Sequence, residues 1–124
     1  MASKNEAVLV VDDDAELLTM VQLVLEDAGY RVVTATEGQE ALDRVAKEMP
    51  ALILLDMKMP GMDGWEFARE FHARYGHQAP IVVLTAAEDA RKRAEEIGAE
   101  GYLGKPFEID HLLSIVQGYM GKRS

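Results

Sequence analysis

The fold of this chain is decided by Leu52-Ile53-Leu54-Leu55-Asp56-Met57-Lys58-Met59-Pro60-Gly61-Met62-Asp63-Gly64. The apolar half of this stretch, bounded by turn residues, is typical of a strand buried on both faces. Asp56 ends that strand, and Pro60, Gly61 and Gly64 then turn the chain away from it. Open α/β sheets place their chemistry at the carboxyl ends of their strands, so we expect Asp56 to lie in a functional site.

Composition excludes several classes of protein. The chain has 124 residues, which is one domain's worth, and 48% of them are hydrophobic, enough for a substantial core. A net charge of −9 argues against intrinsic binding to nucleic acid, whose energy comes largely from Lys and Arg. The absence of Cys excludes disulfides, thiol catalysis and Cys-ligated zinc. Neither a signal peptide nor a membrane-spanning run is recognisable, so we expect a cytoplasmic protein without membrane association.

Apolar runs of strand length alternate with segments of helical periodicity along the whole chain. Strands are expected at residues 7–11, 31–34, 51–55, 80–84 and 101–103. Asp14 is expected to cap the first helix, and Thr36 to Gln39 fit a capping box that opens the second. Such alternation implies parallel strands joined by helices that cover both faces of one sheet, with no residues left over for a second domain.

Polar side chains that a buried sheet does not need end four of the expected strands. They are Asp12 and Asp13, Asp56, Thr85, and Lys105. Parallel strands bring such ends into one crevice, where three carboxylates raise one another's pKa unless a cation enters. Mg²⁺, with Mn²⁺ as a substitute, accepts few protein oxygens and keeps waters that a phosphate can replace. Carboxylate nucleophile, metal, ammonium and hydroxyl together are what phosphoryl transfer requires.

These motifs together resemble the receiver domain of two-component response regulators, in its chemotaxis-type single-domain form. The resemblance rests on Asp12-Asp13, the stretch from Asp56 to Gly64, Thr85-Ala86, and Lys105-Pro106-Phe107. It implies a flavodoxin-like doubly wound (βα)5 fold, with a five-stranded parallel sheet in the order 2-1-3-4-5 and helices on both faces. It also implies a single receiver domain over residues 1–124, with its core at about 7–120.

The resemblance implies a role for each residue at the acidic end of the crevice. Asp56 would be the phospho-acceptor, which takes the phosphoryl group from a sensor histidine kinase. Asp13 would ligate Mg²⁺, Asp12 would hold metal-bound water, and Lys58 would offer its backbone carbonyl to the metal. Such a domain is a signalling module, and an enzyme only in that it catalyses its own phosphorylation and dephosphorylation.

The resemblance also implies how the signal leaves the site. Lys105 would pair with a phosphoryl oxygen, and the Lys105–Pro106 bond is expected to be cis. Thr85 would move onto the phosphoryl group, and Tyr102, the switch aromatic, would swing into the vacated space. The changed surface would lie on the fourth helix, fifth strand and fifth helix.

The same resemblance suggests the partners. We expect a sensor histidine kinase or phosphotransfer protein, a downstream protein target, no direct nucleic acid binding, and a monomer or weak homodimer.

Two alternatives stay open at this point. The first is a Mg²⁺-dependent phospho-aspartate hydrolase of the haloacid-dehalogenase type. Those enzymes usually carry a second aspartate two residues after the nucleophile, where this chain has Lys58. The second is an inert pseudo-receiver, which the complete residue set disfavours. The sequence does not decide between a stand-alone regulator and a domain of a longer protein.

Overall fold

A computed structural model of the chain describes residues 6–121. Residues 1–5 and 122–124, among them the start of the chain on which the signal-peptide expectation rested, lie outside the described residues. Strands and helices alternate as β1 Ala7–Val11, α1 Ala15–Asp27, β2 Arg31–Ala35, α2 Gly38–Lys47, β3 Leu52–Asp56, α3 Gly64–Tyr75, β4 Ile81–Ala86, α4 Ala87–Ile97, β5 Gly101–Lys105 and α5 Ile109–Met120. Within residues 6–121, none of the helices has the length and apolar character that crossing a membrane requires.

The five strands form one parallel sheet in the order β2-β1-β3-β4-β5, which confirms the predicted topology. The register aligns the strand ends: Val11 of β1 lies opposite Leu55 of β3, and Asp56 lies opposite Leu84 of β4. Because the strands are parallel, every carboxyl end reaches the same edge of the sheet. The four predicted polar strand ends therefore meet there.

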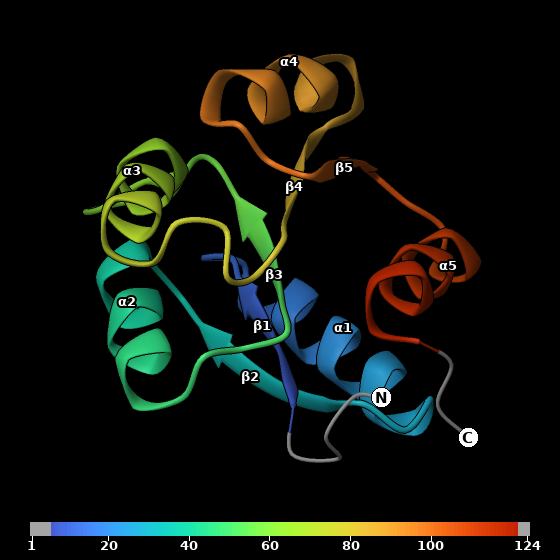
Figure 1. The fold of residues 1–124 in the computed structure, drawn as a ribbon. Helices are drawn as coiled ribbons and strands as arrows, with labels where there is room; N and C mark the ends of the chain where they lie inside the picture. Colours follow the sequence, from blue (N-terminus) through green and yellow to red (C-terminus); the bar gives the residue numbers. More distant parts are fainter. Residues whose placement is uncertain (1–5, 122–124) are drawn as a thin grey trace.

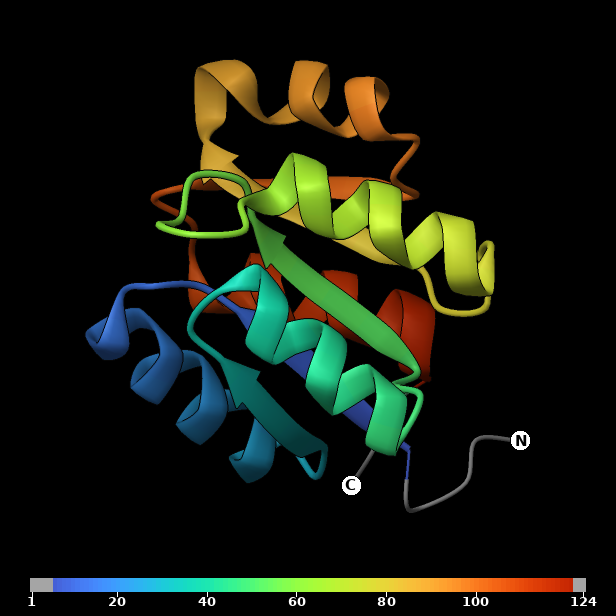
Figure 2. The ribbon, with the colours of Figure 1, turned by 90° about the vertical axis from the view of Figure 1, so that its left-hand side faces the viewer.

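Side chains alternate between two hydrophobic cores, one on each face of the sheet. One face packs against α2, α3 and α4, and the other packs against α1 and α5. Figure 1 shows α2 and α3 on one side of the strands and α1 and α5 on the other, and Figure 2 shows α2 and α3 lying across the sheet. All five residues of β3 are buried, which confirms that the strand carrying Asp56 is covered on both faces.

The capping-box prediction for α2 was wrong by one residue. The helix begins at Gly38, and Glu37 is its N-cap, with a carboxylate that accepts a hydrogen bond from the Gln39 amide. Glu40, rather than Gln39, reaches back to the Thr36 amide, at 2.7 Å. The register shifts because Gly38 packs on Met62, whose carbonyl accepts the Gly38 amide hydrogen at 3.0 Å.

β3, β4 and β5 end later than expected, at Asp56, Ala86 and Lys105 rather than at residues 55, 84 and 103. Asp56, Thr85 and Lys105 therefore belong to the strands themselves. The backbone ladder continues past the last apolar side chain, since Thr85 pairs with Gly104 and Ala86 pairs with Lys105. The polar side chains are thus held by the sheet itself, and β4 passes into α4 without a loop.

Candidate functional site

Three carboxylates meet at the ends of β1 and β3. One oxygen from each of Asp12, Asp13 and Asp56 lies within 4.8 Å of the others. Asp12 and Asp56 are buried, whereas Asp13 faces solvent. Oxygens that share one Mg²⁺ ion lie about 3–4 Å apart, so small side-chain adjustments suffice to fit this cation. An acidic triad of this kind is typical of a Mg²⁺ site.

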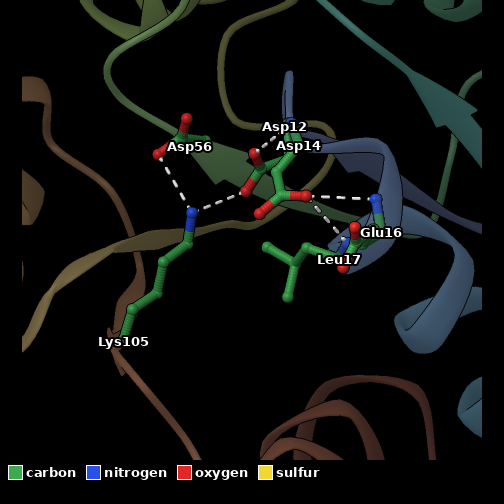
Figure 3. A network of polar contacts seen from close by, with 6 residues as sticks. All are labelled: Asp12, Asp14, Glu16, Leu17, Asp56 and Lys105. Carbon is green, nitrogen blue, oxygen red and sulfur yellow. Dashed lines mark hydrogen bonds and ion pairs between the residues drawn. The ribbon is translucent and has the colours of Figure 1, made fainter.

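Lys105 brings a positive charge to the three carboxylates from β5, the outermost strand of the sheet. Its Nζ lies 2.7 Å from Asp12 Oδ2 and 3.4 Å from Asp56 Oδ1, and Figure 3 shows the ammonium group between the two carboxylates. Because β5 neighbours β4 rather than β3, the lysine side chain spans the width of one strand to arrive there. Four of the predicted site residues are therefore brought together: Asp12, Asp13, Asp56 and Lys105.

The carboxylates of Asp12 and Asp14 accept hydrogen bonds from nearby backbone amides, whereas within residues 6–121 the Asp13 carboxylate accepts none. Asp12 Oδ1 accepts a hydrogen bond from the Asp14 amide at 2.9 Å, which orients its other oxygen toward Lys105. Asp14 is the N-cap of α1, as predicted, and accepts from the amides of Glu16 and Leu17 at 3.0 and 3.2 Å. Asp13 is left facing outward, where a ligand from solvent can reach it.

Burial and crowding of negative charge perturb the two titratable groups at the centre. Desolvation, reinforced by the charge of Asp12, raises the pKa of Asp56 to about 6, although Lys105 offsets part of the effect. Burial lowers the pKa of Lys105, but its hydrogen bond to Asp12 and the two nearby negative charges outweigh burial and raise that pKa overall. At neutral pH the site therefore holds an ionised carboxylate beside a firmly protonated amine.

The loop after β3 folds back tightly onto the end of that strand. The Gly64 amide donates to the Met57 carbonyl at 2.9 Å, and a Cβ on Gly64 would lie 2.7 Å from Met57 Cα and 2.8 Å from the Asp56 carbonyl oxygen. Only glycine fits so close to another backbone. Lys58 is exposed in this loop and lines, with Asp13, a cleft beside the carboxylates.

Thr85 and Tyr102 are near the site but do not join its polar network. Thr85 is buried in β4, and within the described residues no hydrogen bond joins it to the three carboxylates. Tyr102 lies on β5 with 47% of its surface exposed. The Lys105–Pro106 peptide bond that follows is cis, as expected.

One contact between helices was missed by the sequence interpretation. Trp65 Nε1 donates to Glu96 at 3.0 Å, Arg93 donates to the same carboxylate at 2.6 Å, and the Arg93 guanidinium lies 5.5 Å from the centre of the indole ring. No local pattern signals this contact, because the partners lie on α3 and α4 and only the fold brings them together.

Comparison with known proteins gives concordant results. Residues 8–117 match the family described as the response regulator receiver domain. The chain is 36% identical to sporulation initiation phosphotransferase F of Bacillus subtilis over 122 residues, which cover 97% of this chain and 98% of that protein. Several other curated relatives are longer, and the chain spans between 42% and 51% of their length.

Two solved structures illustrate the likeness in three dimensions. The chemotaxis response regulator CheY4 of Vibrio cholerae is 36% identical, with a TM-score of 0.82 over 92% of this chain and 98% of that one. The receiver domain of the sensor histidine kinase PA1611 of Pseudomonas aeruginosa is 31% identical, with a TM-score of 0.84 over 94% of this chain and 98% of that one. The latter structure has a magnesium ion coordinated in its active-site cleft.

Proposed function

Because this chain belongs to the response regulator receiver domain family, we propose that Asp56 is the residue on which it accepts a phosphoryl group. The chain is a phospho-accepting receiver of two-component signalling, a signalling module whose partner is a histidine kinase or phosphotransferase. The observation that carries the assignment to Asp56 is its place at the end of β3, with one oxygen within 4.8 Å of oxygens of Asp12 and Asp13 and with a contact to Lys105 at 3.4 Å. Asp12 is also buried near Lys105, but both of its oxygens accept hydrogen bonds, from the Asp14 amide and from Lys105. Within the described residues Asp56 has only the longer contact to Lys105, at 3.4 Å, so its carboxylate is the less engaged of the two.

The transfer step follows from these charges. A carboxylate oxygen of Asp56 attacks the phosphorus of a phosphohistidine, the new O–P bond forms, and the N–P bond breaks with its electron pair on the imidazole nitrogen. With a pKa of about 6, Asp56 is mostly ionised at pH 7, so its carboxylate can act as the nucleophile. The protonated Lys105 then neutralises one of the oxygens that the phosphoryl group brings.

The donor set fits Mg²⁺, with Mn²⁺ as a substitute. Hard oxygen ligands suit both ions, and a cation relieves the crowding that raises the pKa of Asp56. Asp13 and Asp56 would bind it directly, Lys58 would add its backbone carbonyl, and Asp12 would hold a metal-bound water. When bound, the ion supplies charge neutralisation for the phosphoryl oxygens.

Mg²⁺ should therefore stabilise the protein through Asp13. A ligand at 100 times its Kd adds about 2.7 kcal/mol to folding stability, so a thermal melt in saturating Mg²⁺ should shift upward by several degrees. Asp13→Asn should abolish most of this shift. Asp14→Asn is the matched control, because asparagine also caps helices and Asp14 binds backbone amides instead. Equal shifts in both variants would contradict the metal assignment.

The route from the site to a downstream target involves Thr85 and Tyr102. Phosphorylation adds charge and strong hydrogen-bond acceptors at Asp56, so the Thr85 hydroxyl gains a new partner and Tyr102 fills the space that it leaves. The surface that changes is formed by α4, β5 and α5. In support, this surface carries three of the large hydrophobic side chains that are exposed within the described residues: Tyr102, Ile109 and Tyr119.

Thr85→Ala should leave phosphoryl uptake by Asp56 intact while removing the structural response of α4, β5 and α5. Phosphoryl uptake, followed by intact mass with acetyl phosphate and Mg²⁺, should stay within about two-fold of wild type, because the groups in the polar network remain. The phosphorylation-dependent amide shifts of α4, β5 and α5 in NMR spectra should fall to a small fraction of their wild-type size. Thr19→Ala, on the exposed surface of α1, is the control. A full set of shifts in Thr85→Ala would rule out this coupling.

Several wider expectations belong to the same proposal. We propose one receiver domain with its core at about residues 7–120. In support, all five described strands form one sheet, and the described helices pack on its two faces. The acidic composition supports protein rather than nucleic acid as the downstream target. A cytoplasmic location and a monomeric or weakly dimeric state complete the proposal. Family membership does not support the haloacid-dehalogenase alternative, and the assembled acidic triad and Lys105 do not support an inert pseudo-receiver.

A further inference from the structure

The junction between β4 and α4 has no loop to absorb movement. β4 ends at Ala86 and α4 begins at Ala87, so Thr85 lies two residues before the helix. Ala86 is the N-cap, and no side chain caps this helix end. Any displacement of the Thr85 backbone must therefore be carried directly into the first turn of α4.

Gly104 is the point on β5 against which that first turn rests. Its residue pair in the sheet is Thr85. A Cβ built on Gly104 would lie 2.5 Å from Ala87 Cα, 2.7 Å from Ala87 Cβ and 3.4 Å from Ala87 N. Gly104 has no positive φ, so its backbone conformation would accept any residue. The requirement for glycine here is steric, since the first residue of α4 occupies the space of a side chain.

The rest of α4 is held lightly. Of its residues only Ala90 and Ala94 are buried, and both side chains are small. At the far end of α4, Ile97 packs partly buried against the core, and Arg93 and Glu96 make polar contacts with Trp65 on α3. With so little apolar area to anchor it, the position of α4 depends strongly on how closely its first turn can approach β5.

Gly104 also shares a face of the sheet with both members of the proposed switch. Thr85 lies directly opposite it, and Tyr102 lies two residues earlier on β5, so alternation places all three on one side. Val83, opposite Tyr102, packs into the core against α2, α3 and α4, which identifies that side as the one α4 covers. The space above Gly104 is thus bordered by Thr85, Tyr102 and the start of α4.

We propose that Gly104 is a positioning residue of the phosphorylation switch: its missing side chain lets the first turn of α4 rest on β5 and so couples α4 to Thr85. This inference rests on the proposed roles of Asp56 and Thr85. A side chain at position 104 lifts the start of α4 away from β5 and breaks the coupling. The chemistry at Asp56 is spared, because the carboxylates lie on β1 and β3 and Lys105 points to the opposite face from Gly104.

The test compares Gly104→Ala with wild type in two measurements. Intact mass after treatment with acetyl phosphate and Mg²⁺ should show phosphoryl uptake within about two-fold of wild type. NMR should show that the phosphorylation-dependent amide shifts of α4 fall to less than about a third of their wild-type size. Without a phosphodonor, amide hydrogens in the second turn of α4, which donate to carbonyls of its first turn, should exchange about ten-fold faster than in wild type.

A matched control and a double variant separate positioning from general damage. In Gly101→Ala, on the same strand, the new Cβ meets the Tyr119 hydroxyl at 2.8 Å, the end of a flexible side chain that can move, so the response of α4 should persist. Thr85→Ala combined with Gly104→Ala should lose no more of the response than either change alone, because both act on one coupling.

Each remaining outcome is decisive. Wild-type α4 shifts or unchanged amide exchange in Gly104→Ala would overturn the proposal, as would additive losses in the double variant. Loss of cooperative thermal unfolding in Gly104→Ala would assign Gly104 to folding and overturn it too. Absence of phosphoryl uptake by the wild type would instead refute the function proposed for Asp56, and the exchange comparison would still decide the role of Gly104 in placing α4.

Discussion

Asp56→Asn is expected to stabilise the metal-free protein by on the order of 1–2 kcal/mol near pH 7 and to raise its Tm by roughly 4–8 °C. Asp56 is buried beside Asp12, and its pKa is raised from 3.8 to about 6, chiefly because burial removes water from the carboxylate. Ionising Asp56 therefore costs more free energy in the folded state than in the unfolded chain. An asparagine of nearly the same shape removes that cost.

The sign of the pH dependence follows from the same shift. Between pH 3.8 and about 6 the folded protein binds a proton more tightly than the unfolded chain does, so the contribution of Asp56 to stability falls as pH rises through this window. Above pH 6 the full penalty applies, and below pH 4 it vanishes. The advantage of Asp56→Asn should thus be largest at pH 7–8 and shrink toward pH 4.

Denaturant unfolding in EDTA at several pH values measures this advantage. Asp43→Asn is the control, because it makes the same chemical change at an exposed position on α2. Mg²⁺ should reduce the difference in free energy of unfolding between Asp56→Asn and wild type, since the ion neutralises negative charge in the wild-type site. If Asp56→Asn is no more stable than wild type at pH 7.5 without metal, the ionised Asp56 does not destabilise the folded state and the prediction is wrong.

Much of this site could be predicted because strand ends carry strong signals. An apolar run that stops at an aspartate identifies both a buried strand and the edge to which its carboxylate belongs, and parallel strands bring Asp12 and Asp56 to one place. The strand-end pattern also identified Lys105, and the resemblance to receivers added its role and the cis bond after it. Both the sheet order and the meeting of Asp12, Asp13, Asp56 and Lys105 are confirmed.

What could not be predicted depends on three-dimensional distance rather than on pattern. Gly104 has an ordinary backbone conformation, so nothing local distinguishes it, and its importance arises only where Ala87 comes against it. The contact of Trp65 with Glu96 likewise requires knowing how α3 and α4 pack. Strand ends were placed too early because burial patterns stop with the last apolar residue while backbone pairing continues.

The second large effect expected of Asp56→Asn is the complete loss of phosphoryl uptake. An amide oxygen carries no charge and is a far weaker nucleophile than a carboxylate, so the O–P bond does not form. The neighbouring carboxylates cannot substitute, because Asp12 is bound to Lys105 and the Asp14 amide, and Asp13 lies at the solvent-exposed side of the pocket. Asp63→Asn, which keeps a capping side chain on α3, should retain full uptake.

Intact mass after incubation with Mg²⁺ and acetyl phosphate tests the central claim most directly. The account predicts that the wild-type chain gains one phosphoryl group and that Asp56→Asn, although at least as stable, gains none. A phosphoryl group on Asp56→Asn, or none on a wild-type chain that binds Mg²⁺, would contradict the assignment of Asp56 as the phospho-acceptor.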